Sequence, residues 1–229
     1  MATEKRSLRY EIKMECSREY YPQAQSWVRL NSAAFRMAYP SRWVNNLYFD
    51  THDLDAYNDH ISGASERRKL RYRWYGPDVW QARGQLEVKC KQDRAGWKLV
   101  QDVPADFDLR ACRWTDFKQA LLLNTGQASE RLLDEMLRVS DPQVVIRYRR
   151  DYYVSADAHI RVTLDYHIHQ FDQRFTPQPN LLFELPQTHT MVVEFKCDPQ
   201  HAMQLSDVLA EFPLRVSRHS KYVNAISSQ

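Results

Sequence analysis

Charged and apolar residues alternate with a period of two along several separate stretches of the chain. Successive side chains of a β-strand point to opposite faces, so this alternation predicts strands with one charged face and one apolar face. The predicted strands cover residues 8–16, 44–50, 67–75, 84–92, 96–102, 144–154, 160–165, 181–185 and 191–197.

Other stretches space their apolar residues three and four apart, which predicts amphipathic helices. These helices cover residues 24–35, 53–61, 115–139 and 202–212, and a short one begins near Ser220. No linker rich in Gly, Ser or Pro separates two halves of the sequence. We therefore expect one α+β domain over residues 1–229.

Composition narrows the class of protein. Hydrophobic residues make up 43% and charged residues 27% of the 229 residues, as in ordinary soluble domains. The net charge of +3 argues against a strongly basic nucleic-acid binder, so no nucleic-acid partner is expected. The charged N-terminus has no apolar signal region, and no apolar run approaches the ~20 residues of a membrane span. Together with four cysteines that lack metal-ligand spacing, this predicts a cytoplasmic protein without a transmembrane segment.

The charged positions of the predicted strands combine cations with a carboxylate. A single strand of this kind is typical of a sheet with one face in water. Five or more such strands instead predict a closed antiparallel β-barrel around a polar lumen, with the helices packed on the outside. The residues that share a face within their strands are Lys69, Arg71 and Arg73; Glu87 and Lys89; Arg161 and Asp165; and Glu194 and Lys196.

A weak internal repeat supports closure of the barrel. The segment Leu86–Cys90 reads LEVKC and the distant segment Val193–Cys197 reads VEFKC, so both place Glu-x-Lys in a strand. A third Glu-x-Lys occurs at Glu11 and Lys13.

Crowded cations in such a lumen would repel one another unless an anion neutralises them. Arg offers paired donors to phosphate oxygens, and Lys offers point charges. The carboxylates are hard oxygen ligands for Mg²⁺ or Mn²⁺. These residue types therefore indicate a triphosphate or a longer phosphate chain beside a divalent metal ion.

Eight motifs are distributed over nearly the whole chain. They are Tyr10-Glu11-Ile12-Lys13, Leu47-Tyr48-Phe49-Asp50-Thr51, Lys69-Leu70-Arg71-Tyr72-Arg73-Trp74-Tyr75-Gly76, Leu86-Glu87-Val88-Lys89, Tyr148-Arg149-Arg150, Arg161-Val162-Thr163-Leu164-Asp165, Val193-Glu194-Phe195-Lys196 and Ser220-Lys221-Tyr222. In these motifs and in their order the sequence resembles the polyphosphate-polymerase domain of the VTC (vacuolar transporter chaperone) family, within the triphosphate tunnel metalloenzyme or CYTH-like group.

The resemblance implies roles for individual residues. Glu194 matches the metal-binding glutamate of the family, while Glu11, Glu87 and Asp165 stay open between metal binding and charge balance. A register slip of one residue would put Arg149 in place of Arg150. The implied catalytic residues are Arg71, Arg73, Lys89, Arg150, Arg161, Lys196 and Lys221, and the implied substrate-binding residues are Lys13, Lys98 and Ser220.

The implied activity is that of a polyphosphate polymerase that transfers the γ-phosphate of ATP to a growing polyphosphate chain, with Mn²⁺ or Mg²⁺. An inorganic or nucleoside triphosphatase of the same fold and a non-catalytic polyphosphate-binding module are the alternatives. The first strand reads Glu11-x-Lys13-x-Glu15 rather than the Glu-x-Glu-x-Lys signature of the triphosphatase branch, which favours the VTC branch.

The expected partners are ATP or another triphosphate and polyphosphate. The sequence shows neither the N-terminal inositol-phosphate-sensing domain nor the transmembrane segment of many eukaryotic members, so we expect a stand-alone domain. The phosphate acceptor, the preferred metal, the oligomeric state and any membrane-protein partner are left open by the sequence.

Overall fold

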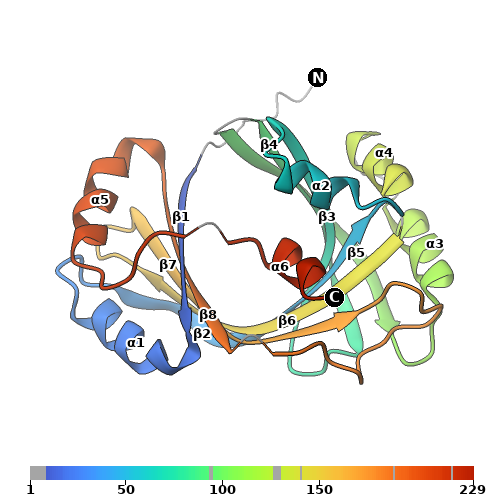
Figure 1. Ribbon diagram of the computed structural model, residues 1–229, viewed down its shortest axis with the longest axis horizontal. Coiled ribbons are helices and arrows are strands. Elements are labelled where there is room, and N and C mark those ends of the chain that lie inside the picture. The colour runs from blue at the N-terminus through green and yellow to red at the C-terminus, as the bar shows by residue number, and fades with distance from the viewer. Residues whose placement is uncertain (1–8, 93–94, 126–129, 140, 188, 218) are drawn as a thin grey trace. The chain divides into compact units, whose positions relative to one another are not determined.

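The computed structural model describes residues 9–92, 95–125, 130–139, 141–187, 189–217 and 219–229 (Figure 1). The strands are β1 (Tyr10–Ser17), β2 (Arg36–Asp50), β3 (Glu66–Tyr75), β4 (Gln81–Gln92), β5 (Ala95–Asp108), β6 (Asp141–Val154), β7 (Ile160–Asp172) and β8 (Thr190–Cys197). The α-helices are α1 (Tyr21–Leu30), α2 (Asp55–Ile61), α3 (Trp114–Asn124), α4 (Glu130–Arg138), α5 (Ala202–Ala210) and α6 (Lys221–Ser227). Short 3₁₀ turns are η1 (Arg18–Tyr20) and η2 (Pro199–His201).

The eight strands form one sheet in the order β1-β8-β7-β6-β2-β3-β4-β5. The pairs β1–β8, β7–β8, β2–β3, β3–β4 and β4–β5 are all antiparallel. The α+β class and the antiparallel sheet are thus confirmed. Over the described residues the order ends at β1 and β5, which do not pair with each other, so barrel closure is not confirmed. Closure depends on hydrogen bonds between the two edge strands, and alternation within a strand does not specify them.

The chain divides into two compact units. The first contains the described parts of 1–43, 148–168 and 188–220, and the second those of 44–147, 169–187 and 221–229. Strands β2, β6 and β7 each contribute residues to both units. The prediction of a single domain therefore stays a prediction.

In the first unit, the apolar face of β1, β7 and β8 packs against α1 and α5, which lie on the same side of these strands (Figure 1). Val162, Val193 and Phe195 are fully buried there because every second residue of their strands turns to this side. The remaining positions of the same strands carry the charged residues. Burial of one face thus fixes where the charged face lies.

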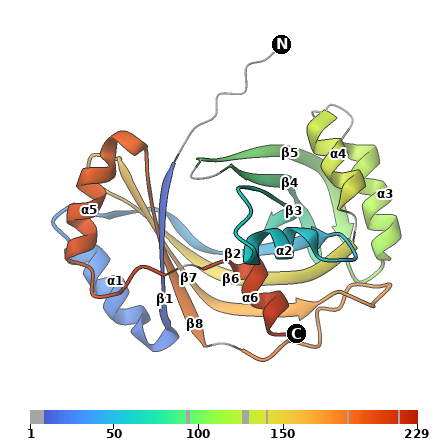
Figure 2. The same ribbon diagram turned by 45° about the horizontal axis from the view of Figure 1, so that its top comes forward.

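In the second unit, α3 and α4 cover the apolar face of β3, β4 and β5 (Figure 2). Tyr72 and Trp74 of β3 and Leu86 and Val88 of β4 are fully buried, together with Phe117 and Leu121 of α3. The intervening residues of β3 and β4 again carry charge. Both units therefore have a strand layer with one apolar face under helices and one charged face.

Three sequence predictions need correction. The predicted strand at 181–185 is wrong, because prolines flank this segment and Asn180 Oδ1 accepts hydrogen bonds from the backbone N–H groups of Leu182 and Phe183. The helical stretch at 115–139 consists of two helices, α3 and α4. Strand β2 begins at Arg36 rather than at Val44.

Among the described residues, no helix is both long enough and apolar enough to span a membrane.

Candidate functional site

The charged face of the first unit is assembled by the registers of β1, β8 and β7. Lys13 lies opposite Glu194, and Glu11 lies opposite Lys196. On the other side of β8, Lys196 lies opposite Arg161 and Glu194 lies opposite Thr163. We call the set Glu11, Lys13, Arg150, Arg161, Asp165, Glu194 and Lys196 the Glu194 cluster.

Glu194 is the centre of this cluster and is only 6% exposed. Lys196 Nζ lies 3.0 Å from its Oε1, and Lys13 Nζ lies 3.8 Å from the same oxygen. Arg150 Nη2 lies 3.7 Å from Oε2. Desolvation by burial opposes ionisation, but the charges of Lys196 and Lys13 hold the pKa of Glu194 well below its usual range. The group is therefore a carboxylate at neutral pH.

Glu11 shares both lysines with Glu194. Its Oε1 lies 3.0 Å from Lys13 Nζ, and its Oε2 lies 3.7 Å from Lys196 Nζ. Thr163 Oγ1, on the strand position facing Glu194, is buried without a hydrogen-bond partner in the described structure. Two carboxylates and a hydroxyl thus gather as hard oxygen donors.

This donor set fits a divalent metal ion of the Mg²⁺ or Mn²⁺ type. Such ions often bind through one or two carboxylates and take their other ligands from water and substrate phosphates. Over the described residues, no three His, Cys, Asp or Glu side chains form a ready-made metal cage. Glu194 and Glu11 are therefore the residues that would hold an ion brought in with a phosphate substrate.

Arg150 and Asp165 form a buried ion pair in the same unit. Arg150 Nε and Nη2 donate to the two carboxylate oxygens of Asp165 at 2.5 and 2.7 Å, and Asp165 is fully buried. Because Arg150 engages both oxygens, charge balance describes Asp165 better than metal binding. Arg149 turns to the other side, where Nη2 donates to Ser41 Oγ at 3.3 Å. Arg150, and not Arg149, belongs to the Glu194 cluster.

The segment before α6 is fastened to β1. Ser217 N donates to Lys13 O at 2.9 Å, and Ser217 Oγ accepts from Glu15 N at 3.0 Å. His219 Nδ1 lies 2.9 Å from Glu15 Oε2, and Lys13 Nζ donates to His219 O at 3.3 Å. These contacts bring Ser220, which follows directly, to the neighbourhood of Lys13.

The charged face of the second unit is centred on Glu87, which is only 1% exposed. Arg71 Nη2 lies 2.5 Å and Arg73 Nη1 lies 3.8 Å from Glu87 Oε2, while Lys98 Nζ lies 3.2 Å from Oε1. Desolvation opposes ionisation, yet the charges of Arg71, Arg73 and Lys98 hold the pKa of Glu87 far below its usual range. With three cations in contact, Glu87 serves as their counter-charge.

Beyond Glu87, three lysines stand side by side across three strands. Lys69 of β3 lies opposite Lys89 of β4, and Lys89 lies opposite Lys98 of β5. Like charges directly opposite each other in a sheet are destabilising. We call Lys69, Arg71, Arg73, Lys89 and Lys98 with Glu87 the Glu87 cluster, in which Arg71, Arg73 and Lys98 contact the carboxylate.

The sequence analysis placed Tyr48 and Tyr222 in family motifs but predicted no contact between them and this cluster, and it did not single out Asn46. Arg71 Nη1 donates to Tyr48 Oη at 3.2 Å, and Arg73 Nε donates to Asn46 Oδ1 at 2.8 Å. The ring of Tyr48 stacks on Tyr222 with 5.3 Å between centroids, and Lys69 Nζ lies 5.5 Å from the centre of the Tyr222 ring. The signal was present, because residues 46, 48 and 50 continue the period-two pattern of β2.

Asp50 ties α6 to this unit. Its carboxylate is buried and accepts hydrogen bonds from the backbone N–H groups of Ala56 and Tyr57 at the start of α2. It also accepts from Tyr222 Oη at 2.5 Å. Lys221 precedes Tyr222, so this hydrogen bond fixes the position from which Lys221 emerges.

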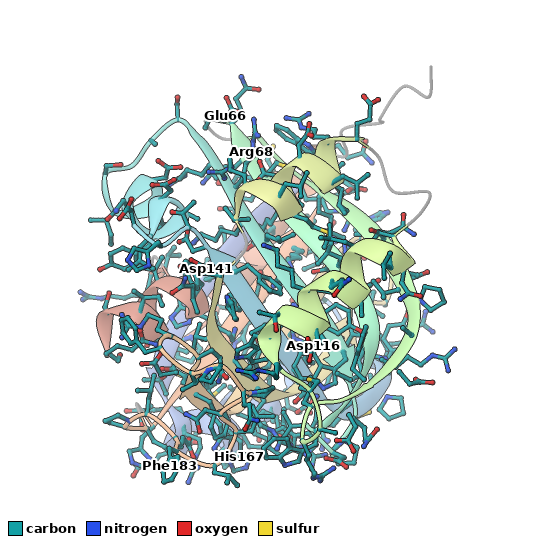
Figure 3. All side chains as sticks on the ribbon, turned by 90° about the vertical axis from the view of Figure 1, so that its right-hand side faces the viewer. Glu66, Arg68, Asp116, Asp141, His167 and Phe183 are labelled. Carbon is teal, nitrogen blue, oxygen red and sulfur yellow. The ribbon has the colours of Figure 1, made fainter. Side chains whose placement is uncertain are left out.

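Not every cation of β3 belongs to the charged face. Arg68 turns to the opposite side, where Nη1 lies 2.7 Å from Glu135 of α4 and Nη2 lies 2.6 Å from Glu66 (Figure 3). Arg68 therefore fastens α4 to the sheet, as the alternation of strand side chains requires. The prediction that the Glu87 and Glu194 clusters line one tunnel stays a prediction.

The α+β fold therefore carries, on the charged faces of its antiparallel sheet, cations gathered around the buried carboxylates of Glu87 and Glu194. A family model described as the VTC domain matches residues 7–229. The chain therefore belongs to the VTC domain family, which confirms the resemblance seen in the sequence. A search of curated proteins found no match.

Three solved structures share the fold over 96% of this chain. A protein of Pyrococcus horikoshii OT3 is 11% identical and is covered over 100% of its length, with a TM-score of 0.50. A candidate adenylate cyclase of Vibrio parahaemolyticus is 13% identical and 98% covered, with a TM-score of 0.51. A candidate adenylyl cyclase of Hippeastrum, described as having a dominant triphosphatase activity, is 16% identical and 95% covered, with a TM-score of 0.53. At these identities the likeness establishes the fold alone.

Proposed function

We propose that this chain is a metal-dependent polyphosphate polymerase that transfers the γ-phosphate of ATP to a growing polyphosphate chain. The observation that carries the proposal is the row of opposed lysines, Lys69, Lys89 and Lys98, in a member of the VTC domain family. Three adjacent like charges favour an occupant with regularly spaced negative charges, and polyphosphate has that property.

In the first unit, Glu194 and Glu11 would hold the metal ion, which when bound supplies positive charge to the phosphate oxygens. Lys13, Lys196 and Arg161 would align the triphosphate of ATP. Arg150 is held rigid by Asp165 and would stabilise charge that develops on the transferred phosphoryl group. Phosphoryl transfer demands mainly positioning and charge stabilisation from a protein.

In the reaction, a terminal oxygen of the acceptor chain attacks the γ-phosphorus of ATP. The bond between this phosphorus and the β–γ bridging oxygen breaks, ADP leaves, and the chain is one phosphate longer. In the second unit, Arg71, Arg73, Lys89 and Lys98 would bind phosphates of the chain. Ser220 and Lys221 would guide one end of it.

A triphosphatase is the second candidate, with water in place of the acceptor chain. It is favoured by the shared fold with the Hippeastrum protein of dominant triphosphatase activity. The lysine row favours the polymerase, because hydrolysis of one triphosphate needs no binding surface for a long product.

The deciding experiment is a product assay. Purified protein is incubated with ATP and Mn²⁺, or with ATP and Mg²⁺, and the products are separated on a gel that resolves phosphate chains. Ladders of long chains together with ADP are the expected result. Orthophosphate as the sole phosphate product would establish the triphosphatase instead.

The variant Glu194→Gln separates both enzymes from a binding module. We expect it to abolish turnover and to keep binding of polyphosphate, whereas Glu19→Gln, an exposed glutamate of η1 in the same unit, keeps full activity. Full activity of Glu194→Gln would overturn the metal assignment. Tight, salt-sensitive polyphosphate binding by a wild-type protein without turnover would identify a binding module.

A further inference from the structure

A cluster of two tyrosines and an arginine lies in the first unit, where the N-terminal half of β2 and the C-terminal half of β6 supply its residues. Arg42 Cζ lies 4.8 Å from the centre of the Tyr152 ring and 5.6 Å from that of Tyr39. Arg42 Nε also donates to Tyr152 Oη at 3.1 Å. The two rings are 5.7 Å apart and nearly perpendicular, at 87°. We call Tyr39, Arg42 and Tyr152 the Tyr39 cluster.

The Tyr39 cluster adjoins the Glu194 cluster. Arg150 Cζ lies 5.9 Å from the centre of the Tyr152 ring, and the same guanidinium lies 3.7 Å from Glu194. One side chain therefore separates the aromatic rings from the groups assigned to the triphosphate.

Packing does not account for the position of Tyr39. Its side chain stays 58% exposed although Arg42 and Tyr152 lie against it, and neighbouring Met37 is 51% exposed. A planar guanidinium beside two aromatic rings presents flat surfaces on which a nucleobase can stack. Stacking of this kind tolerates different bases, because every base has a π-face.

We propose that Tyr39, Arg42 and Tyr152 form a stacking site for the base of a nucleoside triphosphate whose phosphates bind at Arg150 and Arg161. The proposal rests on the proposed function and narrows its substrate to nucleotides over inorganic triphosphate. Because ring faces make the contact, the site favours purines over pyrimidines and does not separate ATP from GTP.

The test compares ATP with inorganic triphosphate on the same variants. Tyr39→Leu should lower kcat/KM for ATP by about 10-fold, mainly through KM, because the stacking surface is lost. It should leave kcat/KM for inorganic triphosphate unchanged. Tyr39→Phe should restore the activity with ATP, since it keeps the ring. Tyr20→Leu, at a tyrosine of η1 that is 52% exposed, is the matched control and should change neither substrate.

If Tyr39→Leu loses kcat/KM equally with ATP and with inorganic triphosphate, or loses none with ATP, the proposal of a stacking site is refuted. Equilibrium binding of a non-hydrolysable ATP analogue and of inorganic triphosphate tests it separately from turnover. If the wild-type protein binds the ATP analogue and inorganic triphosphate but converts neither ATP nor inorganic triphosphate, the proposed function is refuted and the stacking site is not. In that case Tyr39→Leu should raise the Kd for the ATP analogue and leave the Kd for inorganic triphosphate unchanged. A wild-type protein that binds the analogue no better than inorganic triphosphate refutes the stacking site. If Tyr39→Leu changes the oligomeric state and leaves nucleotide binding intact, the exposed ring of Tyr39 serves a contact between proteins, and the stacking site is refuted.

Discussion

The two units carry the same Glu-x-Lys motif on a charged strand face but balance its charge differently. In the first unit, Lys13 and Lys196 each contact both Glu194 and Glu11. In the second, the carboxylate of Glu87 contacts Arg71, Arg73 and Lys98. The difference arises from register, because β1 offers Glu11 opposite Lys196, whereas β3 and β5 offer lysines opposite Lys89.

This comparison teaches that one sequence motif can serve two purposes. Paired carboxylates among cations suit a site that binds a metal ion together with phosphate. An excess of cations around one carboxylate suits a surface that binds a polyanion directly. Strand neighbours, and not the motif itself, decide which of the two results.

The largest expected effect is on stability when the central carboxylate is removed. Glu87→Gln leaves three cations without their buried counter-charge and should lower the free energy of unfolding by about 3–5 kcal/mol. Glu194→Gln should cost less, about 1–3 kcal/mol, because Glu11 and Asp165 still pair with the surrounding cations. Urea denaturation of both variants measures the difference, with Glu130→Gln at the exposed start of α4 as control. Equal losses of unfolding free energy in Glu87→Gln and Glu194→Gln would show that the two units do not differ in charge balance.

The second effect concerns ligand-induced stabilisation. Inorganic tripolyphosphate at a concentration 100-fold above its Kd should raise the free energy of unfolding by about 2.7 kcal/mol, and less at high salt. In the absence of divalent metal, Lys89→Gln should weaken this binding more than Lys196→Gln, because Lys89 has a lysine on both sides. Thermal shift titrations give the two affinities. A larger loss of affinity in Lys196→Gln than in Lys89→Gln would place the polyphosphate-binding surface at the Glu194 cluster instead of the Glu87 cluster.

The third effect is the dependence of stability on pH. The folded-state pKa of Glu87 is depressed below 4.5, so its contribution is complete above about pH 4.5 and is lost as the pH falls through the lower folded-state pKa. The part of this contribution that is lost between pH 4.5 and pH 3 should be on the order of 2 kcal/mol. Denaturation between pH 6 and pH 3 should therefore show a shallower decline in Glu87→Gln than in the wild type. Parallel pH profiles would mean that Glu87 is not stabilised as a carboxylate.

The smallest effect is the relief of repulsion in the lysine row. Without ligand, Lys89→Gln should raise the free energy of unfolding by about 0.5 kcal/mol, because two like-charge pairs disappear. Lys196→Gln should lower it, since Lys196 contacts two carboxylates. Lys118→Gln on α3 provides the control for loss of a lysine outside both clusters. Destabilisation by Lys89→Gln would indicate that the row is neutralised within the protein itself.

Much of the fold and of the site follows from alternation. The period of two places Lys69, Arg71 and Arg73 on one face of β3, and the structure confirms the apolar residues between them in the core. The same rule sends Arg68 to Glu135, a pair that requires knowledge of where α4 lies. The face that a side chain occupies is a local property of its strand and can be predicted from the sequence of that strand. The partner that it contacts on another element cannot be predicted in this way.

The other differences between the sequence predictions and the structure also arise from contacts with other elements of the fold. The first half of β2 has no buried apolar face, since residues 36–40 are all exposed, so its strand character depends on pairing within the sheet. Tyr39 and Arg42 were missed for this reason. Closure of the barrel was predicted from the charged faces that several strands share, but whether β1 and β5 pair depends on backbone geometry that side-chain patterns do not encode.

The division of β2, β6 and β7 between the two units has a consequence for inheritance. Each unit is assembled from three separated stretches of sequence, and the boundaries at residues 43, 147 and 168 fall inside strands. A recombination event with a single crossover at any of these boundaries would join halves of strands from different parents. The two charged faces are therefore expected to be exchanged between relatives as an inseparable pair, and chimaeras that swap one unit alone should fail to fold.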